Sequence, residues 1–316
     1  MTAAIENNYQ GAFERRWGHL KRPHVRALAW LLDAPDLLDP ADPHWEGRIA
    51  SLGHLPPAID DWLNRIDADP TGLELELGSR VYTRLGLYAE KLMAFYYREH
   101  GMLVAHGLQV RAARNDTVGE FDFLLDAGPD GVEHVEFATK FYLLEGEAAS
   151  RFDTFVGPNL ADSLGAKMSK IFDKQLALGA HPAAQDVLPR PVVKARALVK
   201  GWLFYPAGRL GGMDGISQVH CRGFWCALEE VGALAGEQYV VLPKLQWLAP
   251  YRGRDASVSR DELMATLAAQ FETMPMPVLV AVVREEAGVL IETGRGFIVP
   301  DNWRARAAFR QQIAAT

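Results

Sequence analysis

Charged side chains interrupt two otherwise apolar strands in one stretch of the sequence. Residues 119–127 (GEFDFLLDA) and 132–144 (VEHVEFATKFYLL) are predicted to form a β-hairpin, because glycine, proline and aspartate separate two runs rich in aromatic and β-branched residues. Asp122 lies in the first strand, and Glu136 and Lys140 lie in the second. Burying charges costs free energy unless they are paired or bind a ligand. Any fold of this chain must therefore accommodate these three groups.

The alternation of side chains along a strand decides which of these groups can meet. In the second strand, the odd-numbered residues are predicted to pack in the core, and Glu136 and Lys140 share the other face with His134 and Ala138. A solvent-facing or structural role is the simpler interpretation of His134, and membership of a site is the alternative. In the first strand, Asp122 is predicted to lie opposite the core face. That core face comprises Phe121, Phe123 and Leu125.

A glutamate in an apolar helix precedes the hairpin. Residues 79–100 are predicted to form one long helix that ends at Gly101, and apolar residues surround Glu90 within it. No lysine or arginine lies three or four residues from Glu90, where a helical ion pair would need one. Glu90 is either a rim residue that reaches solvent or a distant arginine, or an inward-facing functional acid. The apolar neighbours favour the second interpretation.

Further elements complete the middle of the chain. The sequence predicts a strand over residues 102–114 before a turn at Asn115, a helix over about 160–178 and a strand over 191–205. Lysines recur on the helix at spacings of three and four, and another lysine begins the last strand. They form either solvated faces or contacts to phosphate groups. The candidate contacts are Lys167, Lys170, Lys174 and Lys194.

The predicted order of helix, three strands, helix and strand resembles the PD-(D/E)XK phosphodiesterase superfamily, the fold of many restriction and repair nucleases. The run from Arg84 to Leu144 (RLGLYAEKLMAFYYREH, GEFDFLL and VEFATKFYLL), followed by GPN and the lysine-bearing helix, also resembles the bacterial domain of unknown function 1853 family. The resemblance implies an α/β, restriction-endonuclease-like core with a mixed central sheet flanked by helices. This core would span 79–205, with an N-terminal helical cover over 1–78 and a C-terminal α/β extension over 206–316 packed on it.

The resemblance also implies roles for the charged residues. Asp122 and Glu136 would hold Mg²⁺, or alternatively Mn²⁺, and Lys140 would position or activate the attacking water. Glu90 would complete the acidic cluster. The usual superfamily spacing is E-x-K, but Ala138 occupies the place of that acid here. On a regular strand the present spacing separates the Cα atoms by roughly 13 Å, against about 7 Å for two residues, unless a bulge intervenes.

Three functions remain open at this point. The first is a metal-dependent nuclease that hydrolyses phosphodiester bonds in nucleic acid, with DNA favoured. The second is a catalytically degenerate protein of the same fold that binds nucleic acid or a protein partner without cleavage. Two features favour this second function: the glutamate is displaced from its usual position, and the net charge is -7. With a negative net charge, any contact with nucleic acid must come from a local positive patch. The third is a structural ion pair between Glu136 and Lys140, which leaves Asp122 and Glu90 unexplained.

The remaining sequence favours a cytoplasmic protein without membrane contact. The first ten residues, MTAAIENNYQ, do not resemble a signal peptide, and the apolar run over 277–283 is too short to span a bilayer. Two cysteines without nearby metal-ligand partners favour a reducing compartment. The last third is predicted to be mixed, with a helix over 223–234 and strands over 238–248, 277–286 and 289–300. Helices are expected over 262–272 and 301–315.

Overall fold

The computed structural model describes residues 8–79, 81–113, 116–146, 152–208 and 213–314. Parts of four predicted features, at Arg80, Arg114, Asn115 and Ala315, lie outside these residues. The described helices are α2 (Tyr9–Trp17), α3 (Pro23–Asp33), α4 (Pro57–Ala68), α5 (Thr71–Leu77), α6 (Leu85–Glu99), α7 (Leu164–Ser169), α8 (Pro182–Gln185), α9 (Arg260–Thr273) and α10 (Trp303–Ala314). The longer strands are β1 (Leu103–Ala113), β2 (Asp116–Asp126), β3 (Val132–Leu144), β5 (Val192–Pro206), β6 (Cys221–Ala227), β7 (Gln238–Val241), β10 (Val278–Glu286) and β11 (Val289–Val299). The two-residue strands are β4 (Phe155–Val156), β8 (Arg252–Gly253) and β9 (Val258–Ser259).

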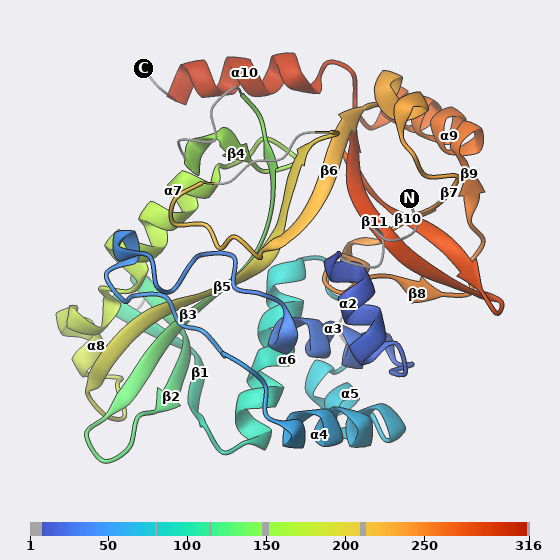
Figure 1. Ribbon diagram of the computed structural model, residues 1–316. Coiled ribbons are helices and arrows are strands. Elements are labelled where there is room, and N and C mark those ends of the chain that lie inside the picture. The colour runs from blue at the N-terminus through green and yellow to red at the C-terminus, as the bar shows by residue number, and fades with distance from the viewer. Residues whose placement is uncertain (1–7, 80, 114–115, 147–151, 209–212, 315–316) are drawn as a thin grey trace.

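One mixed sheet runs through the molecule, with helices on both faces (Figure 1). Among the described residues it has eleven strands, in the order β1-β2-β3-β5-β6-β11-β10-β7-β9, with β4 beside β3 and β8 beside β11. The hairpins at the two ends are antiparallel, whereas β3, β5, β6 and β11 are mutually parallel. Parallel strands need both faces covered, which explains why β3 and β5 are apolar along most of their length.

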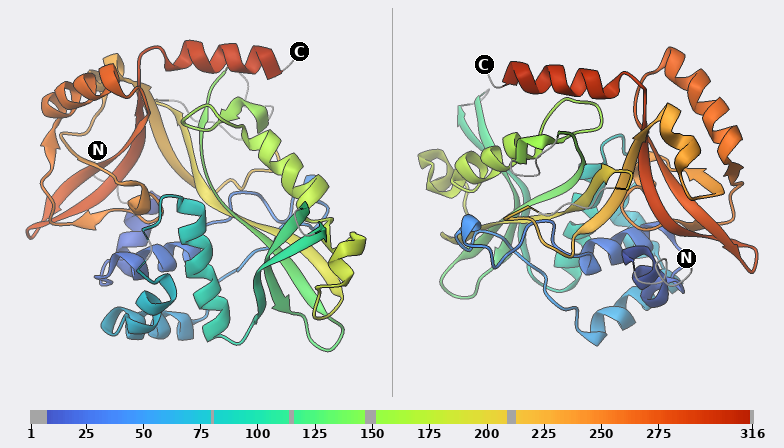
Figure 2. Two further views of the ribbon diagram at one scale, coloured as in Figure 1. Left: turned by 180° about the vertical axis from the view of Figure 1, so that it is seen from behind. Right: turned by 45° about the horizontal axis from the view of Figure 1, so that its top comes forward.

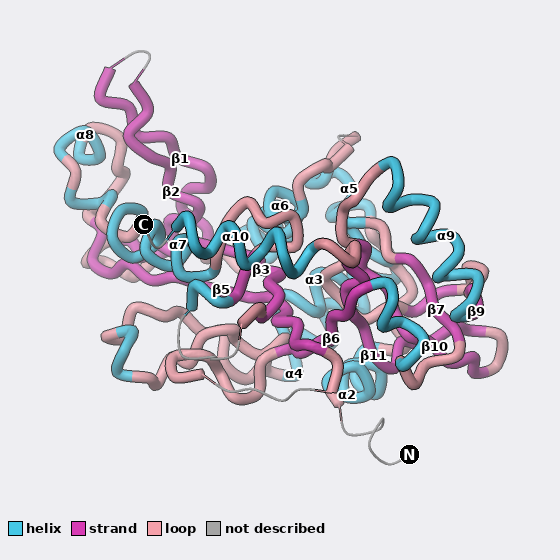
Figure 3. Tube along the Cα trace, turned by 90° about the horizontal axis from the view of Figure 1, so that it is seen from above, coloured by secondary structure: helices cyan, strands magenta, loops and turns pink. Residues whose placement is uncertain are grey.

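Helices α2 to α6 cover one face of the sheet, and α7 and α9 lie on the other, whereas α10 lies along the top of the molecule in the view of Figure 1 (Figure 2). Seen from above, β1 and β2 extend at one end of the molecule, and β7 and β9 lie at the other (Figure 3). None of the described helices is long and apolar enough to cross a lipid bilayer. The α/β class with a mixed sheet between helices is therefore as predicted.

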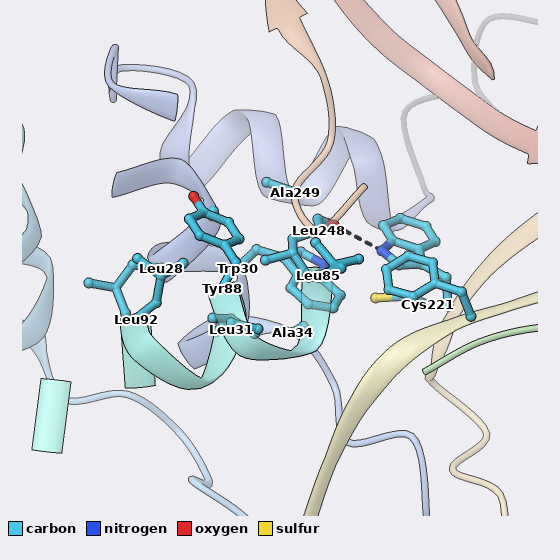
Figure 4. Close-up of a cluster of buried hydrophobic side chains, with 14 of the residues drawn as sticks. Leu28, Trp30, Leu31, Ala34, Leu85, Tyr88, Leu92, Cys221, Leu248 and Ala249 are labelled. Atoms are coloured by element: carbon cyan, nitrogen blue, oxygen red, sulfur yellow. Dashed lines mark hydrogen bonds between the residues drawn. The ribbon is translucent and has the colours of Figure 1, made fainter. Parts of the chain in front are cut away.

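The core beneath the N-terminal helices joins α3 to α6 (Figure 4). Leu28 of α3 and Tyr88 and Leu92 of α6 are buried in it. Trp202 of β5 donates from Nε1 to the main-chain oxygen of Leu248 at 2.9 Å, which connects the sheet to the C-terminal third. Burying an aliphatic or aromatic side chain of this size contributes about 1.5–3 kcal/mol, so this cluster holds α6 firmly against β3.

The segment between α3 and α4 also reaches the sheet. The main-chain N–H of Leu37 donates to Val199 at 3.0 Å, and that of Ala50 donates to Ala197 at 2.8 Å. Trp45 packs in the cluster on the far face from α6. The N-terminal region therefore covers one face with helices and contacts the other with a loop.

Three local predictions are wrong. The predicted helix over 79–100 begins only at Leu85, and Val81 is 82% exposed, because the apolar pattern before Leu85 does not face the core. Residues 223–234 form the end of β6 and a 3₁₀ helix, η5 (Leu228–Ala233), rather than one α-helix. The apolar start of that segment pairs with β5 and β11, and short apolar runs do not distinguish strand from helix. The strand predicted over 238–248 ends at Val241.

The two strands of the hairpin differ in how well alternation predicts their faces. In β3, the odd-numbered apolar residues pack towards α6, and Ala138 and Tyr142 pack on the other face, as predicted. In β2, however, Phe121 and Phe123 pack in different clusters. Gly107 of β1 lies opposite Asp122 and has a φ of 65°, a left-handed conformation that glycine adopts readily. The irregularity coincides with the position of Asp122.

Candidate functional site

The main-chain pairing between β2 and β3 ends next to Asp122, whose side chain accepts the next hydrogen bond from β3. The paired residues run from Asp126 opposite Val132 to Phe123 opposite Val135. Beyond that point the main-chain N–H of Phe137 donates to Oδ2 of Asp122 at 2.9 Å. The hydrogen bond holds the Asp122 carboxyl against β3.

Glu136 is buried, and the partly buried carboxyl group of Asp122 lies beside it. Burial raises the pKa of Asp122 to about 8, with the charge of Glu136 as the next cause. Burial also raises the pKa of Glu136 to about 7, and only 4% of this residue is exposed. Each carboxyl group is among the causes of the other's pKa shift, so the two side chains lie close together. Such a pair titrates as a unit, and it retains protons near neutral pH because two adjacent carboxylates repel each other.

The two oxygens of Glu136 have different surroundings. Gln175 donates from Nε2 to Oε1. Oε2 has no hydrogen-bond partner among the described residues, and neither ring nitrogen of His134 has one. Nε2 of His134 lies 3.7 Å from this Oε2, and His134 is 0% exposed. A buried polar group without a partner costs about 1–3 kcal/mol, so the site holds unsatisfied polar groups at its centre.

Lys140 lies further along β3, on the same face as Glu136. Burial lowers the pKa of Lys140 to about 8, and the charge of Lys167 lowers it further, while Asp162 raises it. Within the described part of the chain, no carboxylate lies within ion-pair distance of its ammonium group. Lys140 therefore faces the carboxyl pair without being neutralised by direct contact, contrary to a simple Glu136–Lys140 ion pair.

Glu90 has a partner that is remote in sequence. Its Oε1 lies 2.7 Å from Nε2 of His106 on β1. The charge of Glu90 also contributes to raising the pKa values of both Asp122 and Glu136. Glu90 is thus an inward-facing acid at the edge of the carboxyl pair.

The predicted phosphate-contacting lysines divide between the two faces of the sheet. Lys170 and Lys174 are exposed, and the charge of Lys170 acts on Glu136. Lys167 lies 3.5 Å from Asp162. Lys194 is exposed but lies on the face of the sheet opposite Glu136. It pairs in register with Glu133, and Glu133 points to the other face because it is three residues from Glu136 and side chains alternate along a strand. Lys194 therefore does not join the other three.

Three residues near the site had no sequence signal of their own. Asp162 accepts a hydrogen bond from Tyr142 at 3.0 Å and lies near Lys140. His106 pairs with Glu90, and Gln175 ends the π-helix η3 (Lys170–Gln175) that continues α7. A π-helix is uncommon and often marks a functional site. The helical spacing of the lysines predicted a helix here but not the altered turn that brings Gln175 to Glu136.

The site offers two neighbouring carboxyl groups to a cation, one buried and one partly buried. No group of three or more histidine, cysteine, aspartate or glutamate side chains in the described residues has the arrangement of a metal site. Mg²⁺ often takes only one or two protein carboxylates and completes its shell with water and phosphate. Oε2 of Glu136 has no hydrogen-bond partner among the described residues, and a bound divalent cation would favour the ionised form of both carboxyl groups. Asp122 and Glu136 therefore fit this requirement.

Comparison with known proteins identifies a family. A family model described as "Domain of unknown function (DUF1853)" matches residues 26–299. No curated protein and no solved structure gives a significant match to the chain.

Proposed function

Because the chain belongs to the DUF1853 family, whose description assigns no activity, we propose a function from the site itself: a metal-dependent nuclease that hydrolyses phosphodiester bonds in nucleic acid. The pair of Asp122 and Glu136, with Lys140 on the same face, carries this proposal. Keeping two carboxyl groups and a lysine inside a sheet without direct ion-pair partners is costly. Binding of a cation and a phosphate would offset this cost.

The topology supports a PD-(D/E)XK core as part of the proposal. Helix α6 precedes the antiparallel strands β1 to β3, and α7 then connects β3 to the parallel strand β5. The carboxyl groups lie on β2 and β3, as the resemblance implies. A bacterial origin and a cytoplasmic location belong to the same proposal. The free thiols of Cys221 and Cys226 support the location.

Asp122 and Glu136 would hold Mg²⁺ or Mn²⁺, which when bound would polarise the scissile phosphate and lower the pKa of a water molecule. The protein groups then have separate tasks. The N–H of Phe137 fixes Asp122, and Gln175 fixes Glu136. The pKa of Lys140 is near 8, so a fraction of its amino groups is neutral at pH 7 and can accept a proton from water at Nζ.

The nucleic-acid backbone would approach along η3. Lys170 and Lys174 are exposed there, and Lys170 is the nearer to Glu136 in electrostatic terms. These two lysines give a local positive patch on a protein whose net charge is -7. DNA is the favoured substrate.

A cleavage assay on labelled DNA and RNA with Mg²⁺ or Mn²⁺ tests the proposal. We expect cleavage by the unaltered protein and a loss of at least about 100-fold in Asp122→Asn, Glu136→Gln and Lys140→Met, as for removal of groups that act in a transition state. Asp130→Asn is a matched control, because Asp130 is exposed in the turn of the same hairpin. Equal cleavage by all four variants would refute the assignment.

A degenerate protein that binds without cleaving is the second candidate. The 4% exposure of Glu136 favours it, because a buried carboxylate is hard for a phosphate to reach. Binding of DNA that weakens in Lys170→Glu, without cleavage under any divalent cation, would support this second function over the first.

A further inference from the structure

His134 and Glu136 are the two unsatisfied groups at the centre of the site. Both are almost completely buried, on the same face of β3. Nε2 of His134 is 3.7 Å from Oε2 of Glu136, and neither atom has a hydrogen-bond partner among the residues described. Two complementary polar atoms therefore face each other without a hydrogen bond.

Another histidine shows how this chain satisfies a buried imidazole. His220 is 4% exposed, and its Nε2 lies 2.8 Å from the hydroxyl of Tyr205 while Nδ1 contacts the main-chain oxygen of Ser217. Both ring nitrogens of that residue have partners. His134 instead packs against the ring of Phe121 in an edge arrangement, with centroids 4.8 Å apart. A purely structural role does not explain why its Nε2 faces a carboxylate.

A small rotation would complete the missing hydrogen bond. The distance of 3.7 Å exceeds the 2.7–3.2 Å range of N–H···O bonds by less than 1 Å. The last torsion of a glutamate side chain is broad and soft, so the carboxylate can turn towards the imidazole. Gln175 donates to the other oxygen, Oε1. Each carboxylate oxygen has two lone pairs, so each would keep one lone pair for a cation after accepting one hydrogen bond.

We propose that His134 is a positioning residue for Glu136: its Nε2–H donates to Oε2, while Gln175 donates to Oε1, and together they fix the carboxylate in the orientation that binds a divalent cation. The part concerning the cation rests on the proposed function. The hydrogen bond itself does not, because it concerns two residues of the chain. Hydrogen bonds to a ligating carboxylate commonly change metal affinity by about 10- to 100-fold.

The tautomer of His134 tests the hydrogen bond directly. Long-range ¹H–¹⁵N correlation spectra of histidine-labelled protein distinguish Nε2–H from Nδ1–H imidazole, and the sequence has nine histidines. The signals of His134 are those missing from His134→Gln. We expect the Nε2–H form, and an Nδ1–H form would overturn the proposal.

Calorimetric titration with Mn²⁺ tests the consequence. We expect His134→Leu to weaken Mn²⁺ binding by about 10-fold or more, and His134→Gln, whose amide can donate, to bind within about threefold of the unaltered protein. His220→Leu is the matched control, since it removes a buried histidine outside the site. If His134→Leu changes the affinity no more than His220→Leu, the positioning role is refuted.

The two experiments separate the two levels of proposal. A protein that shows the Nε2–H tautomer and binds Mn²⁺ but cleaves no nucleic acid supports the positioning role and refutes the nuclease. If the unaltered protein binds no Mn²⁺, the cation part of both proposals is refuted.

Discussion

Replacing Asp122 with asparagine should stabilise this protein at alkaline pH while removing a proposed metal ligand. The pKa of Asp122 is raised from 3.8 to about 8 by burial and by the charge of Glu136. A folded-state pKa above the unfolded value means that this group's contribution to stability is fully present below pH 3.8. It is lost as the pH rises through 8.

The size of the effect follows from the two pKa values. At about 1.4 kcal/mol per pKa unit, the ionised carboxyl costs the fold up to about 6 kcal/mol at pH 8. Because Asp122 titrates together with Glu136, we expect roughly half of this, about 3 kcal/mol. Asparagine has no charge to lose and keeps an oxygen that can accept from Phe137. At pH 5 the gain should fall below about 1 kcal/mol, since the carboxyl is then largely protonated.

Urea unfolding at pH 5 and pH 8 in EDTA measures this difference for the unaltered protein and Asp122→Asn. Asp130→Asn serves as the control, because Asp130 is exposed in the hairpin turn and should change stability by less than about 0.5 kcal/mol at either pH. A gain that is equal at both pH values, or a loss at pH 8, would contradict the reasoning from the carboxyl pair.

Three further outcomes are expected elsewhere in the molecule. Burial lowers the pKa of His220 from 6.5 to about 4. The folded state therefore loses up to about 3 kcal/mol of stability as the pH falls from 6.5 through 4. In urea titrations, His220→Gln should make the free energy of unfolding less dependent on pH across this window. Lys170→Glu should weaken DNA binding in an anisotropy titration at low salt, whereas Lys194→Glu, on the opposite sheet face, should leave it nearly unchanged. Arg295→Met should cost about 3–5 kcal/mol of unfolding free energy, because Arg295 contacts the buried carboxylate of Glu292 at 2.7 Å and Met would leave that charge unpaired; a loss below 1 kcal/mol would argue against a buried ion pair.

The main elements around the site could be predicted from the sequence. The hairpin, the preceding helix and the following strand all appear, because their periodic apolar patterns are long enough to distinguish strand from helix. Residues 223–234 show the limit of this reasoning. Their short apolar run fits either state, and the tertiary pairing of β6 between β5 and β11 decides for the strand.

The faces of the strands were predictable only where the strands are regular. In β3, alternation correctly places Glu136, Lys140 and His134 on one face. In β2, the irregularity at Asp122 places Phe121 and Phe123 in different clusters. The opposite position of Lys194 depends on the register between β3 and β5, which a single sequence does not specify.

The sequence by itself determined that charged groups would have to be accommodated in a buried hairpin, since strand periodicity and apolar composition are local properties. Only the tertiary structure decided what accompanies them. Gln175 reaches Glu136 because it ends a π-helical turn, and Glu90 of α6 contacts His106 of β1. His134 is fully buried beside Glu136, with its ring against Phe121 of the neighbouring strand β2. Partners that are remote in the chain meet only through packing, and local pattern carries no information about such contacts.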